Sequence, residues 1–96
     1  MARKLEAFLL TINRKVVGTR YWFVCPGCEE GHSVDVRTDG GRPNWTFSGS
    51  LDFPTFTPSV FYPDRVCHFF IRSGRMEFLA DCTHPLAGKI VDMLDI

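Results

Sequence analysis

The side chains best suited to chemistry are cysteines and histidines, the usual ligands of zinc. Cys25 and Cys28 flank Pro26-Gly27, and two cysteines at this spacing on a tight loop supply half of a tetrahedral zinc site. Further ligands follow in Cys67-His68 and in Cys82-Thr83-His84. A redox role for the first pair is disfavoured, because no βαβ pattern surrounds it. The sequence therefore predicts one bound Zn²⁺ ion.

More side chains are available than one zinc ion needs. The candidates are Cys25, Cys28, His32, Cys67, His68, Cys82 and His84. Residue chemistry alone favours the four cysteines. Cys67 and Cys82 could equally be core residues, since free cysteine is among the most buried residue types. His32 is more typical of a partner for backbone carbonyls, and His68 of either a ligand or an ordinary strand histidine. Asp81 could accept a hydrogen bond from an imidazole on the His68 face.

The segments that position these residues are expected to be extended. Residues 21–24 and 32–36 flank the Cys-Pro-Gly-Cys loop and predict a hairpin with that loop at its tip. Residues 67–80 predict a second hairpin around Ser73-Gly74, with 67, 69, 71, 76, 78 and 80 facing the core and His68 facing outward. Residues 89–94 predict the closing strand.

Two segments are less clear-cut. Residues 3–17 fit either a helix or a strand by their apolar spacing, and a strand followed by a turn at 13–15 is favoured. Residues 48–58 contain two prolines and alternating aromatic residues, which disfavour a helix or a central strand. We expect an ordered loop there, held down by Leu51, Phe53 and Phe56.

Length and composition bound the class of protein. The 96 residues, 45% hydrophobic with nine Phe, predict a single domain over residues 1–96, whose modest core a metal ion would help to stabilise. Eleven basic and eleven acidic residues give no net charge, so a nucleic-acid partner is not expected. No apolar run has the ~18–20 residues of a membrane span. The expected fold is mainly β: a small zinc-ribbon-like antiparallel sheet with a Cys-x-x-Cys knuckle and a C-terminal hairpin, in the cytoplasm.

Several motifs together resemble one family. They are CPGC with His32, residues 45–51, residues 54–59, Cys67-His68-Phe69, and residues 81–88. They are similar to those of small phage and prophage proteins of unknown function, often labelled "ammonia monooxygenase", and also to zinc-ribbon-like domains found beside ubiquitin-activating-like and isopeptidase-like bacterial proteins. The resemblance implies a zinc site of Cys25, Cys28, His68 and His84, with Cys67, Cys82 and His32 as alternatives.

Two functions follow as hypotheses. The first is a non-enzymatic protein with a structural zinc that binds a host or phage protein in the host cytoplasm, since two thiolates in a knuckle are typical of closed structural sites. The alternative is a zinc-dependent hydrolase that uses the face formed by His68, Asp81 and His84. Four protein ligands favour the first hypothesis, and three with an open position favour the second.

Overall fold

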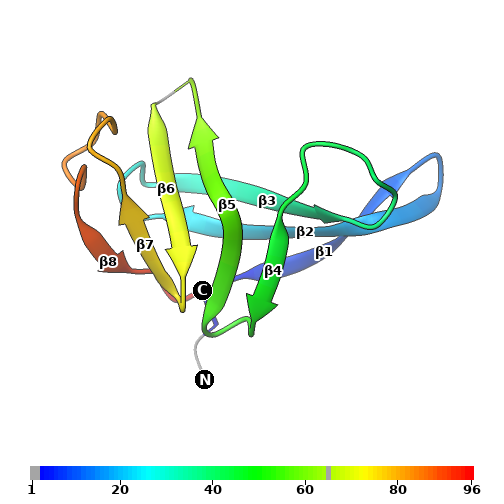
Figure 1. The fold of residues 1–96 in the computed structure, drawn as a ribbon. Helices are drawn as coiled ribbons and strands as arrows, with labels where there is room; N and C mark the ends of the chain where they lie inside the picture. The colour runs from blue at the N-terminus through cyan, green and yellow to red at the C-terminus, as the bar shows by residue number, and fades with distance from the viewer. Residues whose placement is uncertain (1–2, 65) are drawn as a thin grey trace.

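The computed structural model describes residues 3–64 and 66–96, and within them the chain is β-structured without a helix. Two antiparallel sheets form, a three-stranded one in the order β1-β2-β3 and a five-stranded one in the order β4-β5-β6-β7-β8 (Figure 1). The prediction of a mainly β antiparallel fold is confirmed. The strands are β1 (Glu6–Ile12), β2 (Lys15–Cys25), β3 (Glu30–Arg37), β4 (Thr46–Gly49), β5 (Pro54–Tyr62), β6 (Cys67–Arg72), β7 (Arg75–Phe78) and β8 (Ile90–Asp92).

The three-stranded sheet carries the Cys-Pro-Gly-Cys loop at its end. β1 and β2 are joined by Asn13 and Arg14, whose positive φ angles of 51° and 66° match the tight two-residue turns of hairpins. The strand interpretation of residues 3–17 is thus confirmed over the helix. β2 runs to Cys25 and β3 starts at Glu30, so the loop lies at a hairpin tip as predicted.

The C-terminal hairpin has the predicted register. Phe69 pairs with Phe78, Ile71 with Met76, and Arg72 with Arg75 around the Ser73-Gly74 turn. The core-facing side chains of β6, namely Cys67, Phe69 and Ile71, are fully buried, and alternation sends His68 to the opposite face. Ala80 was expected on the core face but is exposed, because the β6–β7 pairing ends at Phe78. The predicted closing strand is β8.

The loop expected at residues 48–58 is wrong in part, because β5 begins at Pro54 and lies between β4 and β6. The strand tolerates its prolines through their positions. Pro54 is its first residue, and Pro58 falls where the pairing with β6 shifts register, between Phe56 and Val60, so a missing N–H breaks no regular ladder there. Phe56 is fully buried as expected, whereas Phe53 is 65% exposed.

Aromatic residues fill the space between the two sheets. Phe23 of β2 meets Phe69 of β6 edge-on at 5.9 Å, and Tyr21 meets Phe56 at 5.5 Å. These edge-to-face contacts are a favoured aromatic geometry. The Tyr62 hydroxyl donates to the Ser33 carbonyl and accepts from the Ser33 N–H at 2.9 Å, which ties β5 to β3. The core therefore holds the two hairpins in a fixed relation.

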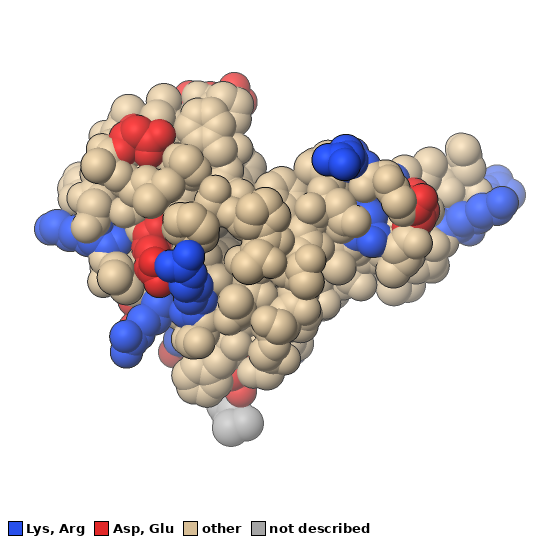
Figure 2. Space-filling view, in the orientation of Figure 1, with Lys and Arg blue, Asp and Glu red and all other residues tan. Residues whose placement is uncertain are grey.

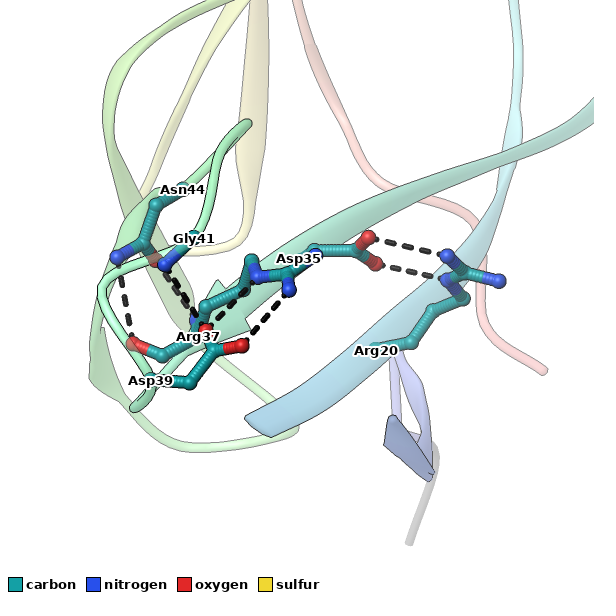
Figure 3. Close-up of polar contacts among 6 residues, drawn as sticks. All are labelled: Arg20, Asp35, Arg37, Asp39, Gly41 and Asn44. Atoms are coloured by element: carbon teal, nitrogen blue, oxygen red, sulfur yellow. Dashed lines mark hydrogen bonds and ion pairs between the residues drawn. The ribbon is translucent and has the colours of Figure 1, made fainter. Parts of the chain in front are cut away.

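The loop between β3 and β4 is held by its own polar contacts (Figure 3). Arg37 binds Asp39 through two hydrogen bonds, and Asp39 also accepts from the Gly41 N–H at 2.9 Å. The hydrogen bonds from Arg37 lower the pKa of Asp39 to about 2. Asn44 accepts from the Arg37 N–H at 2.7 Å. These contacts fix the approach to Trp45, whose indole N–H donates to the Ser59 carbonyl at 3.3 Å.

Charge is scattered over the surface. On the face drawn in Figure 2, Lys and Arg gather towards the two ends and leave the centre mostly uncharged. Several are also paired, for instance Arg20 with Asp35 and Arg72 with Glu77. The described part of the chain has no helical segment with the length and hydropathy that crossing a bilayer requires.

Gly18 provides a test of the three-stranded sheet. Its φ is 154°, and a Cβ there would lie 2.2 Å from the Val36 carbonyl oxygen, a clash with backbone that cannot move aside cheaply. We expect Gly18→Ala to lower the free energy of unfolding by about 1–3 kcal/mol in chemical denaturation. The control is Gly40→Ala, where φ is also positive but nothing lies within 4 Å. Equal losses in both variants would contradict the assigned pairing of β2 with β3.

Candidate functional site

Three residues of the implied ligand set, Cys25, Cys28 and His84, meet at one point between the sheets, and the alternative Cys67 joins them in place of His68. The ligand atoms of Cys25, Cys28, Cys67 and His84 all lie within 4.8 Å of one another. The Sγ atoms of Cys25 and Cys67 are 3.9 Å apart, and Sγ of Cys67 is 3.6 Å from Nε2 of His84. This cluster, called the Cys3His cluster below, could hold a metal ion.

The spacings fit a tetrahedral metal ion. Zinc–sulfur and zinc–nitrogen bonds of about 2.3 and 2.0–2.1 Å place two tetrahedral sulfurs about 3.8 Å apart, and a sulfur and a nitrogen about 3.6 Å apart. The observed separations of 3.9 and 3.6 Å agree with both values. Three thiolates with one imidazole are also a common donor set of closed structural zinc sites.

Three separate segments deliver the four ligands. Cys25 ends β2, Cys28 belongs to the knuckle, Cys67 begins β6, and His84 lies in the loop after β7. Gly27 is needed in the knuckle because a Cβ there would lie 2.2–2.5 Å from the His84 ring atoms. The Leu86 N–H donates to Nδ1 of His84 at 3.2 Å, so Nε2 is the nitrogen turned toward Cys67.

The thiols of Cys25 and Cys67 differ in how readily they lose a proton. The hydrogen bond with Cys67 is the largest cause lowering the pKa of Cys25, and burial opposes it. The pKa of Cys67 is raised, first by the same hydrogen bond and then by burial, because this thiol keeps the proton that the pair shares. Cys25 is therefore the sulfur that ionises first. A cation would compensate the buried negative charge.

His32 lies beside this cluster without belonging to it. The ring is 5% exposed and stacks on Tyr62 at 4.1 Å. Its Nε2 atom has no hydrogen-bond partner among the described residues, yet the ring adds to the lowered pKa of Cys25, after the larger effect of Cys67. His32 thus acts on the cluster from outside it.

His68 lies on the other face of β6, away from the cluster. Its Nε2 is 3.2 Å from the Ser59 hydroxyl, and its Nδ1 is 3.3 Å from Oδ2 of Asp81. The structure places Cys67, and not His68, beside Cys25, Cys28 and His84. His68 contacts Ser59 and Asp81 instead. The hydroxyl, imidazole and carboxylate, in that order, form the second arrangement, called the Ser59–His68–Asp81 chain below.

Irregularities at the ends of strand pairing position this chain. Ser59 follows Pro58 in the stretch where the β5–β6 register shifts, and bulges of this kind re-aim side chains near active sites. Asp81 follows the end of β7, in the loop that leads to His84. Phe61 meets the His68 ring edge-on at 5.3 Å and is 50% exposed. His68 and Asp81 keep 27% and 54% of their side-chain surface exposed, so the chain is open to solvent.

Part of this arrangement could be predicted from the sequence. Asp81 was predicted as an acceptor for an imidazole on the His68 face, and the structure confirms that contact. Ser59 was missed, because it stands between Pro58 and Val60 with no glycine-rich nucleophile motif around it. Cys82 is buried and contacts the His68 backbone rather than the cluster.

These features define a class: a small β protein with a Cys3His cluster between its sheets and a hydroxyl–imidazole–carboxylate chain on an outer face. The BubE family, described as "bacterial ubiquitination-like system serine protease", has a model that matches residues 1–79. The chain belongs to this family. The matched segment includes Ser59 and His68 and ends before Asp81. The match confirms the expectation of a small bacterial family and says nothing about phage origin. No curated protein and no solved structure matches the chain.

The cluster predicts that replacing His84 and replacing His68 have different effects on bound metal. His84→Ala should lower the bound metal from about one ion per chain to near zero, because it removes a ligand. His68→Ala should leave it unchanged, because the ring faces Ser59. Elemental analysis of protein purified without chelator measures both variants. Metal loss in His68→Ala with full retention in His84→Ala would contradict the assigned cluster.

Proposed function

We propose that the protein is a serine peptidase in which Ser59 is the nucleophile, His68 the general base and Asp81 the group that orients and stabilises the imidazole. The observation that carries this proposal is the continuous contact from Ser59 Oγ to His68 Nε2 and from His68 Nδ1 to Asp81 Oδ2. A hydroxyl, an imidazole and a carboxylate in this order activate serine on unrelated folds, so they are recognised by geometry and not by chain order.

The chemistry then runs as acyl transfer. As Ser59 Oγ bonds to the substrate carbonyl carbon, Nε2 of His68 takes the hydroxyl proton, and Asp81 stabilises the resulting imidazolium. The bond from carbon to the leaving amine breaks, and the amine takes the proton from His68. Water then attacks the Ser59 ester while His68 takes a proton from it. The ester C–O bond breaks, His68 returns that proton to Ser59 Oγ, and the carboxylic acid and the free serine are released.

The substrate class follows from the family description. Ubiquitination-like chemistry joins the C-terminus of a small protein to an amine, so a peptidase of such a system cuts an amide bond that follows that C-terminus. We therefore infer that the acyl side of the substrate is the C-terminal tail of a ubiquitin-like protein. The protein partner expected from the sequence, a host or phage protein, becomes in this proposal the substrate.

The Cys3His cluster has a structural role in this proposal, with Zn²⁺ as the ion that its donors fit best. Cys67 and His68 are neighbours on β6, and His84 lies in the loop that carries Asp81. A bound ion would thus hold both segments that supply the base and the carboxylate. Four protein ligands leave no open position for a reacting water, which supports a serine mechanism over the zinc-dependent hydrolase.

The nucleophile can be tested with a fluorophosphonate probe, which phosphonylates activated serines with loss of fluoride. Wild-type protein should gain one adduct by intact mass, located at Ser59 by peptide mapping. Ser59→Ala should abolish the adduct. His68→Ala should slow labelling by about 10²–10⁴-fold, the range of a general base. Both variants should keep full metal and a native melt, because neither residue belongs to the cluster.

Ser33→Ala and Ser73→Ala serve as matched controls, since among the described hydrogen bonds a serine hydroxyl meets a histidine ring at Ser59, whereas Ser33 and Ser73 bond through their backbones. They should label at the wild-type rate. Labelling that survives in Ser59→Ala would remove Ser59 from the mechanism. Amide hydrolysis that survives in Ser59→Ala and stops on chelation would instead support the zinc-dependent hydrolase.

A further inference from the structure

We propose that Cys82 is a positioning residue for His68, a role that rests on the proposed serine mechanism. Cys82 is 8% exposed and stands outside the Cys3His cluster. Its Sγ accepts from the His68 N–H at 3.3 Å and donates to the His68 carbonyl at 3.1 Å. Both backbone groups of the general base are therefore in contact with one buried thiol.

The thiol replaces a bond that the sheet lacks. His68 stands opposite Leu79, and an antiparallel pair of this kind normally exchanges two N–H···O bonds. Only one forms, from the Leu79 N–H to the His68 carbonyl at 2.9 Å. The Leu79 carbonyl turns into the following loop, where it accepts from the N–H groups of Cys82 and Gly88 at 3.2 and 3.3 Å. Without Cys82 the His68 N–H would lose its acceptor.

The use of the Cys82 thiol in place of a backbone acceptor affects where the Asp81 carboxylate can lie. Because the chain leaves β6 after Leu79, it can turn and bring Asp81 to Nδ1 of His68. A strand that continued to pair would hold residue 81 along the ladder and not over the imidazole. Cys82 thus accepts the hydrogen bond that the His68 N–H would otherwise lack when the chain turns away from β6 toward Asp81. Its Sγ is hydrogen-bonded to the His68 backbone, which makes it a positioning residue and not a catalytic one.

The experiment compares Cys82→Ala and Cys82→Ser in the full, metal-loaded chain. We expect Cys82→Ala to slow fluorophosphonate labelling of Ser59 by about 10–100-fold, the effect of a small misplacement of a catalytic group. Amide hydrogen exchange at His68 should accelerate in the same variant. Cys82→Ser keeps a donor and an acceptor and should recover most of both. Val34→Ala, a truncation of a fully buried residue in the other sheet, is the control for general destabilisation and should label at the wild-type rate.

The outcomes separate the two proposals. If wild-type Ser59 is not labelled at all, the serine mechanism fails, and the positioning role fails with it. If wild type is labelled and Cys82→Ala labels equally fast with unchanged His68 exchange, the mechanism stands and the role of Cys82 is overturned. Loss of metal from Cys82→Ala would also overturn it, because Cys82 would then act through the cluster. An equal slowing in Val34→Ala would attribute the effect to stability alone.

Discussion

The meeting of three chain segments at the Cys3His cluster is the constraint on which the rest of the structure depends. The knuckle belongs to the three-stranded sheet, whereas Cys67 and His84 belong to the five-stranded sheet and its loop. A chain of this size buries little more than about 60% of its unfolded surface, so its aromatic core works with a small margin. A structural zinc site contributes about 10–16 kcal/mol of apparent binding free energy at neutral pH, which is as large as the total stability of an ordinary domain.

The alternating side chains of β6 link the Cys3His cluster to the Ser59–His68–Asp81 chain. Cys67 faces inward to the cluster and His68, the next residue, faces outward to Ser59 and Asp81. Because successive side chains of a strand point to opposite faces, fixing the sulfur also fixes the direction of the imidazole. The two sites share a strand and a loop but no ligand. Two residues outside both arrangements contact their backbone. The Trp45 indole donates to the Ser59 carbonyl, and the Cys82 thiol contacts the N–H and carbonyl of His68.

Much of the fold could be predicted from the sequence, because it depends on local rules. The Ser73-Gly74 turn and the alternating apolar residues set the hairpin register, and the Cys-Pro-Gly-Cys spacing indicated half of a metal site. The rest depended on long-range geometry. Spacing could not distinguish Cys67 from His68 as the partner of the knuckle, since the choice turns on which face of β6 meets the other sheet. Ser59 carries no local motif, and its contact with His68 becomes visible only when β5 lies beside β6.

The hydrogen bond from the Leu86 N–H to Nδ1 of His84 sets which ring nitrogen faces the thiols. Because the backbone engages Nδ1, Nε2 is the nitrogen that faces Cys67, at 3.6 Å from its Sγ. The same loop carries Asp81, whose carboxylate contacts the other imidazole, that of His68. One short stretch of chain therefore orients a group in each arrangement, and an insertion or deletion between residues 81 and 84 would disturb both at once.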